Sequence, residues 1–143
     1  MPKQFPLHSS GFNPFGALIG LNFESCAEGA SRCTIELRED LVNPHGVLHG
    51  GVIYSMADTG MGGALYSLLA AEEGCATRRI TIKYSRPVET GTVICDTKVL
   101  HRRGQLAELD SVIRADSRIV ARARGVYAIF KIQSEMVTTG DSK

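Results

Sequence analysis

One segment of this 143-residue chain has a helical hydrophobic pattern over several turns, whereas most of the chain after it alternates with the period of a β-strand. From Val52 to about Ala71, apolar side chains recur at 3.6-residue spacing and form a broad apolar face. That face must be covered, and the strand segments are the part of the chain that can cover it. The pattern therefore predicts an α+β fold in which a curved antiparallel sheet wraps around one long helix.

The other expected elements follow from periodicity and from turn residues. Asn13-Pro14 is typical of a short helix, with Asn as the N-cap and Pro at the first helical position. Glu72-Glu73-Gly74 is expected to end the long helix. We expect a hairpin before the long helix and a four-strand antiparallel meander after it, with strands at residues 18–28, 32–38, 79–84, 91–102, 105–115 and 119–132.

The length suits one compact domain, and 43% hydrophobic residues suffice for a core. We expect a single domain over residues 1–143, with its core at about 13–132 and a short flexible C-terminal tail. No apolar run reaches the roughly 18 residues of a membrane-spanning helix, and the N-terminus lacks the apolar region of a secretory signal. These features predict a small cytoplasmic protein with no membrane partner.

The formal net charge of +1 hides an uneven distribution, because residues 1–74 carry 3 basic and 8 acidic groups and residues 75–143 carry 13 and 7. Two interpretations of the basic half stay open: solvated strand faces, or a local site for an anionic ligand such as a phosphate. Nucleic-acid binding is not expected, because aromatic residues are sparse and Trp is absent.

The four cysteines have neither C-x-x-C nor zinc-ligand spacing. We therefore expect them to be small buried side chains, with no disulfide framework and no metal site. They lie at Cys26, Cys33, Cys75 and Cys95.

The segment with the most chemical information runs from Asn43 to Gly51, directly before the long helix. The first backbone N–H groups of a helix have no intrahelical partner, and the helix dipole adds partial positive charge there. His49-Gly50-Gly51 lies at this point, and glycine lets a ligand carbonyl approach the donors. The arrangement suits stabilisation of an oxyanion. A plain glycine-rich loop with a structural His49 is the alternative.

Asp58 is the second candidate, because the helical pattern places its carboxylate at the margin of the apolar face. Burial of a carboxylate is costly unless it is paired or hydrogen-bonded. Two roles for Asp58 therefore stay open. It is either a structural residue bonded to a nearby loop or a partner subunit, or a general base or nucleophile. The chain has no G-x-S-x-G, Walker or G-x-G-x-x-G motif. The helical run Gly60–Gly63 is interpreted as close packing against a neighbouring backbone.

Two stretches of this sequence resemble the hot-dog-fold acyl-CoA thioesterases, specifically the phenylacetate-degradation-type branch. They are N-P-H-G-V-L-H-G-G-V-I-Y-S-M-A-D-T, which starts at Asn43, and T-R-R-I-T-I-K-Y-S-R-P-V, which starts at Thr77. The resemblance covers about residues 13–130. It implies a hot-dog fold, and hydrolysis of a small, medium-chain or aryl acyl-CoA to free acid and CoA. It implies no metal or redox cofactor. Coenzyme A would enter as part of the substrate.

The resemblance also implies residue roles. Asp58 corresponds to the catalytic carboxylate, Gly50 to the amide that polarises the thioester carbonyl, and Thr77 to a hydroxyl that holds water. His49 and Asn43 correspond to positions that shape the loop and orient the thioester or the water. The site would straddle a dimer interface, with Asn43, His49 and Gly50 from one subunit and Asp58 and Thr77 from the other, in a dimer of dimers.

Substrate-binding candidates are Gly51 at the helix start and three arginines that could receive the CoA phosphates, Arg86, Arg102 and Arg103. Two other functions stay open. One is a hot-dog dehydratase or hydratase acting on acyl thioesters, which usually pairs a His with an acid in a different motif. The other is a non-enzymatic acyl-CoA-binding protein, which would not need Asp58. Fold alone decides neither.

Overall fold

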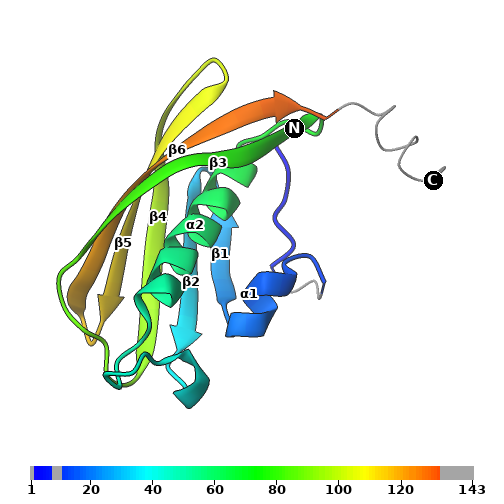
Figure 1. Ribbon diagram of the computed structural model, residues 1–143. Helices are drawn as coiled ribbons and strands as arrows, with labels where there is room; N and C mark the ends of the chain where they lie inside the picture. The colour runs from blue at the N-terminus through cyan, green and yellow to red at the C-terminus, as the bar shows by residue number, and fades with distance from the viewer. Residues whose placement is uncertain (1, 8–10, 133–143) are drawn as a thin grey trace.

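The computed structural model describes residues 2–7 and 11–132, so the predicted C-terminal tail lies outside the described residues. Along this part of the chain the elements are α1 (Pro14–Ile19), β1 (Asn22–Ala27), β2 (Ala30–Glu36), the 3-10 helix η1 (Glu39–Leu41), α2 (Gly50–Tyr66), β3 (Glu73–Tyr84), β4 (Thr92–Arg103), β5 (Leu106–Ala115) and β6 (Arg118–Lys131) (Figure 1). The predicted short helix at Asn13-Pro14 is confirmed: the Asn13 side chain accepts a hydrogen bond from the Gly16 amide at 3.2 Å.

The six strands form one antiparallel sheet in the order β1-β2-β4-β5-β6-β3. The sheet curves around α2, which contacts all six strands (Figure 1). Met56, Ala57, Met61, Ala64 and Leu65 of α2 are completely buried against it. The apolar face that the sequence placed on this helix therefore forms the centre of the core, and the predicted α+β architecture is confirmed.

The predicted four-strand meander is wrong, because β3 does not pair with β4. Strand β3 lies at the far edge of the sheet and pairs with β6, so only β4, β5 and β6 form a meander. The chain leaves β3 and crosses to β4, which pairs with β2. Strand periodicity reports which residues face the core but contains no information about which strand lies alongside.

The long helix is shorter than predicted. It ends at Tyr66, and Leu68 and Leu69 lie in a following turn whose amides bond to the carbonyls of Leu65 and Tyr66. Leu69 is still fully buried, so the apolar pattern continues beyond the helix itself. Gly74 does not stop the helix but belongs to β3, where a Cβ would lie 2.9 Å from the Phe130 ring.

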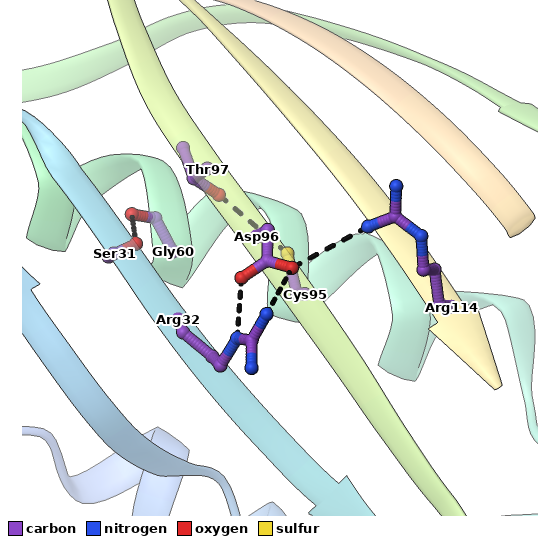
Figure 2. A network of polar contacts seen from close by, with 7 residues as sticks. All are labelled: Ser31, Arg32, Gly60, Cys95, Asp96, Thr97 and Arg114. Atoms are coloured by element: carbon purple, nitrogen blue, oxygen red, sulfur yellow. Dashed lines mark hydrogen bonds and ion pairs between the residues drawn. The ribbon is translucent and has the colours of Figure 1, made fainter. Parts of the chain in front are cut away.

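Within the run predicted to pack closely, Gly60 and Gly63 do so, but against side chains and not against backbone as predicted, and Gly62 has no close neighbour among the described residues. A Cβ at Gly60 would lie 2.9 Å from Thr97 Oγ1, and one at Gly63 would lie 2.8 Å from the Phe23 ring. Ser31 donates a hydrogen bond to the Gly60 carbonyl at 2.7 Å (Figure 2). Polar groups of the sheet therefore approach the helix backbone where glycine makes room.

Part of the basic C-terminal half is paired on the outer face of the sheet. Arg32 forms a two-pronged ion pair with Asp96 at 2.7 and 3.0 Å, and Arg114 reaches the same carboxylate at 3.5 Å (Figure 2). Arg124 pairs with Asp110 on neighbouring strands. Arg32 belongs to the acidic half of the chain; for Arg114 and Arg124 of the basic half, the interpretation as solvated strand faces is confirmed.

All four cysteines are free thiols, and Cys33 and Cys95 are fully buried in the core. Cys26 and Cys75 are half-buried, so the expectation of buried side chains holds for two of the four. Among residues 2–7 and 11–132, no helix has the length and apolar character needed to cross a membrane.

Candidate active site

The loop before α2 is folded by Asn43. Its side-chain oxygen accepts hydrogen bonds from the amides of His45 at 2.8 Å and Val47 at 3.4 Å, and its own amide donates to the Val47 carbonyl at 2.8 Å. Gly46 turns the chain with a φ of +81°, a conformation that favours glycine. Because its oxygen is occupied by the loop, Asn43 has its side-chain NH₂ left to offer a ligand.

His49 is the N-cap of α2. Its Nδ1 accepts a hydrogen bond from the Gly51 amide at 2.8 Å, so in the neutral ring the proton lies on Nε2. Its carbonyl accepts from the Val52 amide at 2.9 Å. The amides of Gly51 and Val52 are therefore satisfied, and the Gly50 amide has no partner within residues 2–7 and 11–132. The sequence analysis gave Gly50 the carbonyl-polarising role and Gly51 a substrate-binding role; of these two amides, the described residues leave Gly50 free and occupy Gly51.

Gly50 is held from the opposite side by Tyr84, the last residue of β3. The Tyr84 hydroxyl donates to the Gly50 carbonyl at 2.7 Å, and its ring lies 3.4 Å from where a Gly50 Cβ would be. A groove of about 340 Å³ opens here, lined by Asn43, Gly50, Tyr84 and Arg86 among others. Asn43, Gly50 and one of the predicted arginines thus share a single groove.

Asp58 lies two turns further along α2 and is half-buried. The Thr77 hydroxyl of β3 donates to Asp58 Oδ1 at 2.7 Å, and the Tyr127 hydroxyl of β6 donates to the same oxygen at 2.5 Å. Asp58 Oδ2 has no hydrogen-bond partner among the described residues. The carboxylate is therefore held by one oxygen and presents the other. Thr77 contacts the carboxylate itself, whereas the resemblance assigned it to a water.

The structure divides the predicted site residues into two groups within one chain. Asn43, His49 and Gly50 lie together at the start of α2, and Asp58 lies with Thr77. Eight residues of helix separate Gly50 from Asp58, which corresponds to about 12 Å along the axis and about 80° around it. A thioester carbonyl cannot contact both groups of one chain at once.

The arginines predicted to bind phosphate are in different situations. Arg102 forms a two-pronged ion pair with Glu73 at 2.7 and 3.2 Å, and hydrogen bonding from Arg102 lowers the pKa of Glu73 to about 2. Arg103 lies next to the β4–β5 turn, exposed and without an ion pair in the described part of the chain. Arg86 is also exposed, and it alone of the three lines the groove at Gly50.

Two tyrosines of the site were missed by the sequence reasoning. Tyr127 lies on the same alternating face of β6 as the buried residues Ala123 and Ile129, which indicates a core-facing strand position and nothing more, and it is indeed only 2% exposed. A buried tyrosine hydroxyl needs a partner, which is the one signal that pointed to a nearby acceptor. Tyr84 is the last residue of β3, just before Arg86-Pro87. Its contact with Gly50 could not be expected from the sequence, because it depends on how β3 packs against α2. No cluster of three potential metal-ligating side chains occurs among the described residues.

A curved antiparallel sheet around one long helix is the hot-dog fold. In the described part of this chain, the helix bears the half-free carboxylate of Asp58 and begins with the free Gly50 amide. The sequence model of the thioesterase superfamily matches residues 45–122, a segment that includes the helix start, Asp58 and Thr77. The chain belongs to the thioesterase superfamily.

Individual relatives agree with this family. The acyl-coenzyme A thioesterase PaaI of Escherichia coli (strain K12) is 30% identical over 111 residues, which are 75% of this chain and 76% of the relative. The crystal structure of thioesterase HI1161 from Haemophilus influenzae has a TM-score of 0.85 at 20% identity, covering 92% of this chain and 95% of its own. A mutant of the phenylacetic acid degradation protein PaaI from Thermus thermophilus has a TM-score of 0.75 at 23% identity, covering 80% and 97%. The two structures share the fold.

Proposed function

We propose that this protein hydrolyses the thioester of a small, medium-chain or aryl acyl-CoA to the free acid and CoA. The observation that carries the proposal is the Gly50 amide, the donor at the start of α2 that the described residues leave unpaired. A backbone N–H at a helix start, aided by the helix dipole, stabilises the negative charge that develops on a thioester oxygen. The superfamily supports thioester hydrolysis, and the name of the Escherichia coli relative supports coenzyme A as the thiol.

In the proposed reaction, Oδ2 of Asp58 takes a proton from a water molecule as the water oxygen bonds to the thioester carbon. The carbonyl oxygen becomes an oxyanion and accepts a hydrogen bond from Gly50 N–H. When the carbonyl re-forms, the C–S bond breaks, and the CoA thiolate receives the proton from Asp58. Direct attack by Oδ2 would use the same free oxygen and give an anhydride that water then hydrolyses. Both routes need water as the only co-substrate.

We propose that two chains share each site. Strand β3 supports this assembly, because it is a 12-residue edge strand in which no residue is fully buried. Its outer edge has no strand partner among the described residues, and such an edge readily pairs with another chain. Twofold pairing through β3 would bring the Gly50 loop of one subunit toward Asp58 of its partner. A dimer of dimers completes the proposed assembly.

The experiment that tests the hydrolase is CoA release, measured by chromatography, from a panel of short, medium-chain and aryl acyl-CoAs. We expect release from at least one thioester, and its loss in Asp58→Asn, which keeps the shape of the side chain and both hydroxyl contacts. Asp110→Asn, an outer-face substitution, is the matched control and should remain active. Binding of acyl-CoA without release would indicate the binding protein instead. Addition of water to an enoyl-CoA would indicate the hydratase.

Shared sites are tested with hybrid dimers. A chain with Asp58→Asn and a chain with Gly50→Pro carry different tags and are co-expressed, and hybrids are purified through both tags. Each parent should be inactive, whereas the hybrid contains one intact site of two and should recover about half of the wild-type activity. An inactive hybrid from two correctly folded parents would contradict a site shared between chains.

A further inference from the structure

Two hydroxyl groups converge on one oxygen of Asp58 from neighbouring strands. Thr77 of β3 and Tyr127 of β6 are directly opposite each other in the antiparallel register, so their side chains lie on the same face of the sheet. Both donate to Oδ1, at 2.7 and 2.5 Å. The β3–β6 register shifts immediately after Thr77, between Thr77 and Arg79. Such irregularities re-aim side chains, and this one lies beside the carboxylate.

Tyr127 is suited to hold the carboxylate in one orientation. Its ring is fixed in the core, with 2% of the residue exposed, so the hydroxyl has little freedom to move away. Its oxygen also lies 2.8 Å from the Asp58 backbone carbonyl, but the charged carboxylate is the stronger acceptor. Burial, and then the hydrogen bond to Asp58, raise the pKa of Tyr127 well above its ordinary value. The hydroxyl therefore remains a donor through the range in which an enzyme works.

We propose that Tyr127 is a positioning residue, which together with Thr77 fixes Oδ1 of Asp58 and so orients Oδ2 toward the thioester. The proposal rests on the proposed function, since it assigns which carboxylate oxygen reacts. Oδ2 is the oxygen without a partner among the described residues, and rotation of the carboxylate would exchange the two oxygens. Each hydroxyl that holds Oδ1 opposes that rotation. Tyr127 therefore acts on the rate of the chemical step and not on substrate affinity.

The kinetic test is Tyr127→Phe, which keeps the buried ring and removes only the hydroxyl. A lost hydrogen bond to a charged group predicts a fall in kcat of about 10- to 100-fold, with KM unchanged. Thr77→Val should act in the same way, and Thr77→Ser should restore activity because it keeps the hydroxyl. Tyr66→Phe is the control: Tyr66 ends α2, and its ring packs edge to face against Phe5. A normal kcat in Tyr127→Phe, or an equal loss through KM, would overturn the proposal.

A second readout does not depend on catalysis. A buried hydroxyl bonded to a carboxylate exchanges slowly with water, so proton NMR should show a downfield hydroxyl signal in the wild-type protein. The signal should be absent in Tyr127→Phe, displaced in Asp58→Asn and unchanged in Tyr66→Phe. If the wild-type protein releases no CoA but shows this pattern, the proposed function fails while the contact stands. If Asp58→Asn leaves the signal in place, the positioning role fails even in an active enzyme.

Discussion

Replacement of Gly50 by proline should abolish the oxyanion donor without disturbing the helix. Gly50 is the first residue of α2, where proline is favoured because its fixed φ suits the helix and its missing N–H bonds nothing there. The residue before it, His49, has φ −60° and ψ 133°, a conformation that a following proline accepts. The Gly50 amide has no partner among the described residues, so no internal hydrogen bond of this part of the chain is lost.

The expected effect is set by what one oxyanion donor contributes. Loss of such a donor raises the activation free energy by about 2.7–4 kcal/mol, which corresponds to a fall in kcat of about 100- to 1,000-fold. Gly50→Ala is the matched control, because it keeps the N–H and adds the same Cβ, which meets the Tyr84 ring at 3.4 Å in both variants. The assay is steady-state CoA release, with thermal unfolding measured in parallel. We expect both variants to unfold near the wild-type temperature.

The comparison of proline with alanine isolates the N–H group. If both variants lose activity equally, contact with Tyr84 is the cause and the amide is not. If Gly50→Pro turns over as fast as Gly50→Ala, the Gly50 amide does not stabilise the transition state, and the assignment of this helix start as the oxyanion site is refuted.

Three further predictions concern packing, charge and substrate binding. Gly60→Ala should lower the free energy of unfolding by about 1–3 kcal/mol, because its Cβ would meet Thr97 Oγ1 at 2.9 Å. Gly62→Ala should raise the free energy of unfolding by about 1 kcal/mol, because its Cβ meets nothing within 4 Å among the described residues. Urea unfolding measures both. The Glu73–Arg102 pair should stabilise the fold above pH 4.5, because the pKa of Glu73 is lower in the folded state than in the unfolded chain. This stabilisation should be lost as the pH falls toward about 2. The unfolding temperature of Glu73→Gln should lack this pH dependence. Arg86→Gln should raise the KM for acyl-CoA by about tenfold. The KM for an acyl N-acetylcysteamine thioester, which has no phosphates, should not change, and an equal effect on both thioesters would exclude a phosphate contact. Arg102→Gln should change neither KM, because Arg102 is already paired with Glu73.

Local features of the fold could be predicted from the sequence, and non-local ones could not. The short helix at Asn13-Pro14, the strand periods and the apolar face of α2 are encoded by neighbouring residues, so each could be expected from the chain alone. The position of β3 beside β6 depends on contacts between residues such as Thr77 and Tyr127, which are 50 positions apart in the sequence. No periodicity reports such a pairing.

The same division applies to the candidate site. The loop from Asn43 to Gly51 is a continuous segment, so its chemistry could be inferred from turn residues and helix-end geometry. The surroundings of Asp58 come from β3 and β6, and Tyr127, 69 positions away, has the pattern of any aromatic residue of a strand. The pairing of Arg102 could not be predicted either, because its partner Glu73 was expected at the end of the long helix, whereas it begins strand β3.

Strand β3 connects the two groups of site residues. It holds Asp58 through Thr77 and, seven residues later, holds the Gly50 carbonyl through Tyr84. It is also the edge at which we propose that a second chain pairs. The contacts that orient the carboxylate and the helix start are therefore made by the strand on which dimerisation would act. In a site shared by two chains, pairing of the β3 edges would set the distance between the two groups, and the fold needs no further element to bring them together.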